Sequence, residues 1–254
     1  MGFWKEKNRY MRQAQDHIAD MHARYENETV ESIRNSVVYK DADNIRPSNA
    51  VSNTTPQIIV ADMDSVSGAV KYHVGKTCIL NFASYVAPGG GFINGAWAQE
   101  EALCHESNLY NILKEHESYY MWNRNNLNNH LYTNRAIYSS DVIFEHEGKK
   151  HVFDVITCAA PKLAEAYRSD EVSAEDNTEA LRSRIQFIFD ILAQQEVEVV
   201  ILGAWGCGVF KQDSHEVAAL FEEFIENGAN TTERVVFAVP QGPNLVAFYD
   251  TFNC

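Results

Sequence analysis

The sequence predicts an α/β domain built around a largely parallel central sheet. Short runs of β-branched and other apolar residues recur along the chain, as is typical of strands buried on both faces. Longer segments with apolar residues at helical spacing lie between these runs. Because strands alternate with helices, we expect crossover connections and mostly parallel strand pairs.

The chain begins with a helical pattern, expected over residues 3 to about 39. Residues 40–55 are rich in Asn, Asp, Ser and Pro, which is typical of a loop. We therefore expect an N-terminal helical cap over residues 1–50 and a main body over residues 51–254, packed together as one compact unit.

In the main body, expected strands alternate with expected helices. Strands are expected at residues 56–63, 76–84, 151–160, 197–205 and 234–240. Helices are expected at residues 99–122, 173–195, 213–228 and, as a short closing helix, 244–252. The asparagine-rich segment 123–135 is expected to be a surface excursion.

Composition and charge narrow the range of functions. The chain has 254 residues, 45% of them hydrophobic and 22% charged, an ordinary composition for a globular protein with a substantial core. Its formal net charge of -14 repels nucleic acid and anionic lipid, so we expect no DNA or membrane partner. We expect no secretory signal and a cytoplasmic location, because the N-terminus lacks an apolar stretch. A phosphorylated ligand would have to be held by backbone N–H groups.

Cysteine usage indicates reduced thiols. The 5 cysteines are scattered, odd in number and never form a C-x-x-C pair. Glu101, Cys104 and His105 lie at one-turn spacing, which invites a metal interpretation. However, H-E-x-x-H is absent and no second cluster of His or Cys lies nearby, so we expect neither a metal nor a cofactor.

Two glycine-rich junctions follow apolar strands and precede helices, where ligands of open α/β sheets bind. In the first, Gly89 to Gly91 precede Gln99, Glu100 and Glu101. Glycines let the backbone approach a ligand closely. The alternative is a flexible turn followed by acidic residues that only stabilise a helix start. Neighbouring residues on a helix point about 100° apart. If both glutamates act, one transfers a proton and the other holds a hydroxyl.

The second junction is GAWGCGVF, residues 203–210. Gly206 and Gly208 permit a tight turn that cradles an anion, and Phe210 follows where a ring could pack on a sugar or base. The alternative is a plain strand-to-helix connection with Phe210 in the core. Cys207 has no paired His, so we interpret it as a small loop residue.

Together these motifs resemble a known family. GGG, then residues 92–98, then QEE resembles the signature of the poly(ADP-ribose) glycohydrolases, and GCGVF resembles the diphosphate-binding loop of the macrodomain fold. RVVFAVPQGPNLVAFYDTF is similar to the last strand and helix of the compact microbial-type members, and RYENETVESIRNS resembles their N-terminal cap. The implied fold is a macrodomain-like three-layer α/β/α sandwich with a mixed central sheet and an N-terminal helical extension.

The resemblance also implies an activity for the main body, hydrolysis of the ribose–ribose O-glycosidic bond of poly(ADP-ribose). Glu101 matches the catalytic glutamate, which would donate a proton to the leaving oxygen and then activate water. Glu100 matches the neighbour that holds ribose hydroxyls. The positions matching substrate contacts are Asn81, Gly89, Gly90, Gly91, Gln99, Gly206, Cys207, Gly208, Val209 and Phe210.

Other functions remain open. One is a macrodomain reader that binds ADP-ribose without cleaving, although readers do not need the QEE motif. Another is a hydrolase of mono-ADP-ribosylated protein or of another ADP-ribose derivative. The partners expected are poly(ADP-ribose), ADP-ribose and ADP-ribosylated proteins, and the chain is expected to be a monomer. Segments 123–135 and 165–176 have no role in the resemblance.

Overall fold

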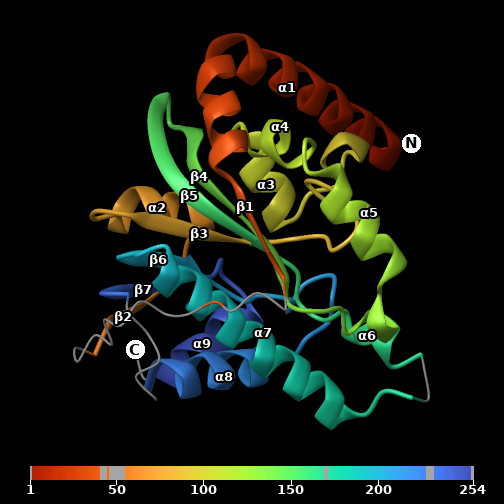
Figure 1. Ribbon diagram of the computed structural model, residues 1–254, viewed down its shortest axis with the longest axis vertical. Coiled ribbons are helices and arrows are strands. Elements are labelled where there is room, and N and C mark those ends of the chain that lie inside the picture. The colour runs from red at the N-terminus through yellow and green to blue at the C-terminus, as the bar shows by residue number, and fades with distance from the viewer. Residues whose placement is uncertain (1, 41–44, 46–54, 169–170, 227–231, 253–254) are drawn as a thin grey trace.

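A computed structural model describes residues 2–40, 45, 55–168, 171–226 and 232–252 (Figure 1). Within this part of the chain, a seven-stranded mixed sheet lies between two layers of helices. The predicted α/β sandwich is therefore confirmed. No described helix combines the length and the apolar character needed to cross a bilayer.

The sheet has both parallel and antiparallel pairs. Its strands are β1 (Val37–Lys40), β2 (Gln57–Ala61), β3 (Thr77–Phe82), β4 (Arg135–His146), β5 (Lys149–Cys158), β6 (Val199–Leu202) and β7 (Arg234–Ala238). They lie in the order β1-β4-β5-β3-β6-β7-β2. The β1–β4 and β4–β5 pairs are antiparallel and the other pairs are parallel. All five predicted strands are present, and β1 and β4 are additional.

Helices cover both faces of the sheet. They are α1 (Gly2–Asn35), α2 (Ser65–Tyr72), α3 (Gln99–His105), α4 (Leu109–Leu113), α5 (Glu117–Asn125), α6 (Leu163–Ala166), α7 (Ala174–Gln194), α8 (Ser214–Glu226) and α9 (Pro243–Phe252), with 3-10 turns η1 (Phe92–Asn94) and η2 (Asn128–His130). Helices α7, α8 and α9 share one hydrophobic cluster with the sheet, and α1 to α5 share the other. In Figure 1, α1, α3, α4 and α5 lie in the upper part of the molecule and α7, α8 and α9 lie in the lower part.

The helix predicted over residues 99–122 is wrong in extent, because three shorter helices replace it. Asn108 interrupts the helical path. Its backbone N–H donates to the Ile143 carbonyl at 3.1 Å, and its side-chain oxygen accepts from the Ile143 N–H at 2.9 Å. Pairing with β4 therefore takes the place of the helical hydrogen bonds of the next turn.

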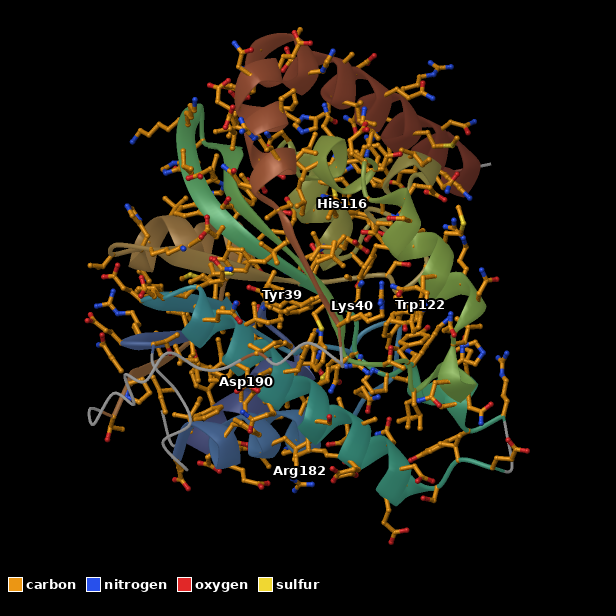
Figure 2. The ribbon with its side chains drawn as sticks, in the orientation of Figure 1. Tyr39, Lys40, His116, Trp122, Arg182 and Asp190 are labelled. Atoms are coloured by element: carbon orange, nitrogen blue, oxygen red, sulfur yellow. The ribbon has the colours of Figure 1, made fainter. Side chains whose placement is uncertain are left out.

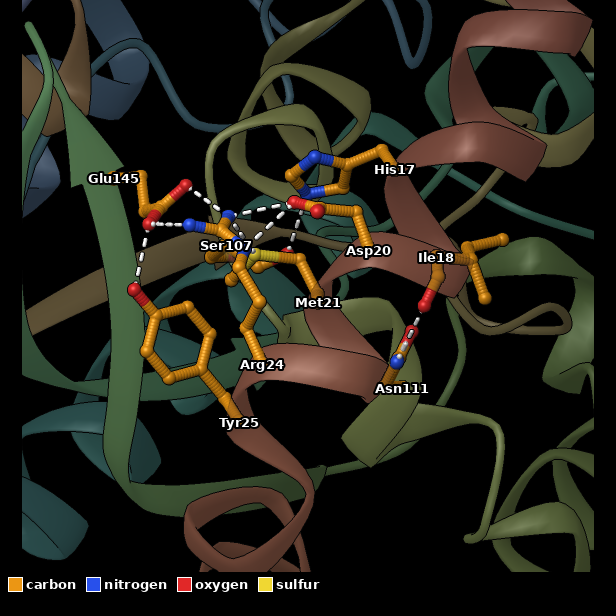
Figure 3. A network of polar contacts seen from close by, with 9 residues as sticks. All are labelled: His17, Ile18, Asp20, Met21, Arg24, Tyr25, Ser107, Asn111 and Glu145. Atoms are coloured by element: carbon orange, nitrogen blue, oxygen red, sulfur yellow. Dashed lines mark hydrogen bonds and ion pairs between the residues drawn. The ribbon is translucent and has the colours of Figure 1, made fainter.

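Helix α1 ends at Asn35, so the predicted helix to residue 39 is too long. The helix is attached at several points (Figure 3). Arg24 forms a bidentate ion pair with Glu145 on β4, and the Tyr25 hydroxyl donates to the same carboxylate at 2.6 Å. Further along, His17 Nε2 lies 2.9 Å from the Ser107 carbonyl oxygen. These contacts fix α1 to the sheet and to the segment after α3.

The predicted cap and main body share the sheet. Strand β1 pairs with β4, and the hydroxyl of Tyr39 on β1, labelled in Figure 2, accepts a hydrogen bond of 2.7 Å from Gln195 after α7. Most of the loop predicted over residues 40–55, including the boundary at residue 50, lies outside the described residues. The boundary stays a prediction.

The asparagine-rich segment 123–135 is a surface excursion only in its middle. At its ends Asn123 and Arg135 are buried, and Arg135 Nε donates to the Asn123 side-chain oxygen at 2.8 Å. The Arg135 guanidinium also lies 4.2 Å from the centre of the Trp122 ring, labelled in Figure 2. Arg135 begins β4, so the polar composition of this segment hides the start of a strand.

Candidate active site

A cleft of about 840 Å³ opens beyond the carboxyl ends of β3, β6 and β7. Its lining comes from the start of α2, the loops after β3, β6 and β7, Ala160 and most of α3. Both predicted glycine-rich junctions therefore meet in one place, because the carboxyl ends of parallel strands lie at the same edge of a sheet. Residues 64–66 and 238–244 also line the cleft, and no motif in the sequence indicates them.

Gln99 joins α3 to the sheet. Its side-chain oxygen accepts from the Phe82 N–H at 2.8 Å, and its nitrogen donates to the Leu80 carbonyl at 2.9 Å. The same nitrogen donates to the Ser65 hydroxyl at 3.1 Å. The side chain thus pairs with the end of β3 as a neighbouring strand would. An amide is required, since a carboxylate could accept but not donate.

Glu100 points back toward the same strand end and is only 3% exposed. Its oxygens accept from the Ser84 N–H at 2.7 Å and from the Asn81 side-chain nitrogen at 3.2 Å. Burial raises the pKa of Glu100 to about 8. Asn81 is fully buried behind Glu100 and does not line the cleft.

The raised pKa of Glu100 predicts a pH-dependent stability. Between its ordinary value of 4.5 and about 8, the folded chain holds a proton that the unfolded chain lacks. The free energy of unfolding is therefore expected to fall as pH rises through this window, by at most about 1.4 kcal/mol per pH unit. Urea unfolding from pH 5 to 9 checks this, and Glu100→Gln is expected to show a shallower dependence than the wild type. Equal dependences would contradict it.

Glu101 faces the glycine loop instead. One oxygen accepts from the Gly91 N–H at 2.7 Å and the other from the Ala98 N–H at 2.9 Å. The second bond is half of a capping box, so Glu101 does stabilise the helix start. The first bond has no such role, because it joins the carboxylate to a loop ten residues earlier. Glu100 thus faces the end of β3 and Glu101 faces the glycine loop, and both line the cleft.

Gly90 lies against both carboxylates. Its φ is +60°, and a Cβ there would lie 2.6 Å from Glu101 Oε1 and 2.7 Å from Glu100 Oε2. Any side chain would be strained in this conformation and would collide with both groups. The glycine is therefore needed for the approach of the loop to the glutamates. Gly91 also lines the cleft, whereas Gly89 does not.

The loop after β6 forms the facing wall. Gly206, Gly208, Val209 and Phe210 line the cleft, and Val209 is 68% exposed. Phe210 also packs against the core, with the Tyr132 ring centre at 6.3 Å. Phe210 therefore lines the cleft and contacts the core, and its packing on a sugar or base stays a prediction. Cys207 does not line the cleft, and burial raises the pKa of its thiol to about 12, which argues against a nucleophile.

The cleft carries no positive side chain within the described part of the chain. Its ionisable lining residues are all acidic, namely Asp64, Glu100, Glu101 and Glu106. An anionic ligand could be held here only by backbone N–H groups and other uncharged donors.

His105, a candidate in the metal interpretation, belongs to an aromatic cluster. Its ring centre lies 4.6 Å from that of Phe92 and 4.7 Å from that of Trp97. Burial lowers the pKa of His105 to about 4, so the ring is neutral at pH 7. Among the described residues no group of three or more His, Cys, Asp or Glu could hold a metal ion.

Comparison with known proteins identifies the family. The family described as "Microbial-type PARG, catalytic domain" matches residues 6–147, more than half of the chain. The chain belongs to this family. The GGG–QEE signature lies inside the matched residues, so the resemblance to the poly(ADP-ribose) glycohydrolases is confirmed. The GCGVF motif lies beyond the matched residues. PARG denotes poly(ADP-ribose) glycohydrolase.

Solved PARG structures share the fold over nearly the whole chain. PARG from Thermomonospora curvata has 24% identity and a TM-score of 0.84, covering 96% of this chain and 100% of that one. The same enzyme bound to the inhibitor ADP-HPD has 25% identity and a TM-score of 0.82, covering 96% and 99%. PARG from Deinococcus radiodurans in complex with ADP-ribose has 29% identity and a TM-score of 0.82, covering 89% and 97%. No curated protein matches.

Proposed function

We propose that this protein hydrolyses the ribose–ribose O-glycosidic bond of poly(ADP-ribose) and releases ADP-ribose. One observation carries the proposal: the Glu101 carboxylate lies in the cleft, held between the Gly91 and Ala98 N–H groups. Membership of the microbial-type PARG family supports it. So do the related structures solved with ADP-ribose and with ADP-HPD.

Glu101 acts as the acid and then as the base. Its protonated form donates to the leaving ribose oxygen while positive charge develops at the anomeric carbon. The carboxylate that results accepts the Gly91 and Ala98 N–H groups, which stabilise it and fix its orientation. It then removes a proton from the water that attacks the same carbon.

Glu100 holds a ribose hydroxyl and remains uncharged below a pH of about 8. Two adjacent negative charges in the buried cleft would repel each other, and the neutral Glu100 avoids this. Backbone N–H groups of the two glycine loops bind the diphosphate, and the Phe210 ring packs on the ligand. This arrangement suits a cleft whose charged lining is entirely acidic.

The direct test combines two measurements on the purified protein. With labelled poly(ADP-ribose) we expect release of ADP-ribose, and calorimetric titration is expected to show binding of ADP-ribose. Binding without release would instead support the reader function. Release only from mono-ADP-ribosylated protein would identify a different hydrolase.

Partners and location are part of the same proposal. The protein would act as a monomer in the cytoplasm on polymer attached to ADP-ribosylated proteins. Its net charge of -14 supports the absence of direct contact with DNA or anionic membranes.

A further inference from the structure

Trp97 is a large aromatic side chain at the rim of the cleft. It lines the cleft, yet 58% of its surface is exposed. It directly precedes Ala98, whose N–H donates to Glu101 at 2.9 Å. An exposed tryptophan beside the proton donor is therefore available to a substrate.

Neighbouring rings hold Trp97 in place. The Tyr10 ring centre on α1 lies 4.8 Å from that of Trp97, and the His105 ring centre on α3 lies 4.7 Å away. His105 in turn packs edge-on against Phe92. A ring held in this way loses little conformational entropy when it stacks on a ligand.

The neighbouring part of α1 is basic, although the chain carries a net charge of -14. Residues 6–12 contain Lys7, Arg9 and Arg12 against one carboxylate, Glu6. The Arg9 guanidinium lies 4.9 Å from the centre of the Tyr10 ring. Helix α1 also touches the loop before Trp97, because a Cβ on Gly95 would lie 2.5 Å from the Lys7 carbonyl oxygen. Aromatic and positive side chains are therefore contiguous here.

We propose that Trp97, Tyr10 and Arg9 form a second binding subsite, which holds the polymer unit on the leaving-group side of the scissile bond. The nucleobase of that unit stacks on Trp97 and its diphosphate faces Arg9. Bases stack on aromatic rings whatever their sequence, and a guanidinium pairs well with phosphate. The inference rests on the proposed function, since only a polymer has such a unit.

The position of Trp97 selects the leaving-group side. In the proposed function, the terminal ADP-ribose unit is bound between the two glycine loops, inside the cleft. Glu101 would donate its proton to the oxygen of the departing unit. Glu101 is buried, whereas Trp97, next to the Ala98 that contacts it, is exposed at the rim. The departing unit therefore passes the rim where Trp97 and α1 meet.

The test compares long polymer with ADP-ribose for the wild type, Trp97→Ala and Trp97→Phe. In Trp97→Ala we expect the KM for polymer to rise about tenfold, equivalent to about 1.4 kcal/mol. We expect kcat and the Kd of ADP-ribose to stay within twofold, and Trp97→Phe to retain most of the affinity. Arg9→Gln is expected to raise the KM for polymer at low salt and to weaken its salt dependence.

Trp122→Ala is the matched control, since Trp122 is 41% exposed and does not line the cleft. Trp122→Ala is expected to leave the KM for polymer and the Kd of ADP-ribose unchanged. Equal losses for polymer and ADP-ribose in Trp97→Ala would place Trp97 on the terminal unit and overturn the subsite. An unchanged KM, or a loss confined to kcat, would overturn it as well. A wild type that releases no ADP-ribose would refute the proposed function instead.

Discussion

Glu101→Gln is expected to lower ADP-ribose release from polymer by about 10²- to 10⁴-fold, the usual contribution of a general acid–base group. Glutamine has nearly the same shape but can neither donate the proton nor activate water. Binding of ADP-ribose is expected to remain within a few-fold of the wild type. Radiolabelled polymer under single-turnover conditions and calorimetric titration measure the two quantities separately.

Glu101→Gln is also expected to lower the stability of the protein. A control variant is needed to separate this effect from the loss of turnover. Both Glu101 oxygens accept backbone N–H groups, and glutamine offers only one oxygen. One of these part-buried N–H groups loses its acceptor, so we expect the free energy of unfolding to fall by about 1 kcal/mol. Glu106→Gln is the matched control, because Glu106 lines the cleft but bonds to His146 at 2.6 Å. Retention of wild-type turnover by Glu101→Gln would refute its assignment as the acid and base.

Gly90→Ala is the second substitution with a large expected effect. The new Cβ would lie within 2.7 Å of both Glu100 and Glu101 in a residue with φ of +60°. The loop or the carboxylates must move, and displacement by about 1 Å costs roughly 100-fold in rate. We expect turnover to fall by at least that factor. The left-handed backbone adds a loss of about 1–2 kcal/mol in stability.

Gly148→Ala is the control that distinguishes the collision of the new Cβ with the two glutamates from the strain of the left-handed backbone. Gly148 has a φ of +75° in the β4–β5 turn, and a Cβ there would meet nothing within 4 Å. This variant is expected to lose similar stability while keeping wild-type turnover. If Gly90→Ala kept its turnover as well, the close approach of the loop to the glutamates would have no role in catalysis. Thermal melts and the polymer assay on both variants decide this.

The parts of the fold predicted correctly are those with a local signal. Strands β3, β6 and β7 are short, mostly apolar runs, β5 is mostly apolar in its second half, and α7, α8 and α9 have clear helical periodicity. Strand β4 begins in a polar, asparagine-rich segment and contains an irregularity between Ser139 and Val142, so its pattern is weak. The break after α3 depends on hydrogen bonds between Asn108 and Ile143, a contact that no local pattern shows.

The candidate site also has a part that could be predicted from the sequence and a part that could not. The glycines and the QEE motif could be identified from spacing and resemblance. The positions of their side chains could not, because they depend on distant contacts. Asn81 lies behind Glu100, and Cys207 does not line the cleft. No local pattern indicates the place of Trp97, since its neighbour Tyr10 lies 87 residues earlier in the chain.

The three hydrogen bonds of Gln99 have a consequence for the order in which the site forms. Helix α3 has seven residues, too few to be stable alone, and Gln99 ties it to β3. In the sheet β3 lies between β5 and β6, both of which follow residue 148. The half of the chain that carries the signature therefore holds the reacting groups but lacks both neighbours of the strand that positions them. During synthesis, the active site can form only after most of the polypeptide has emerged.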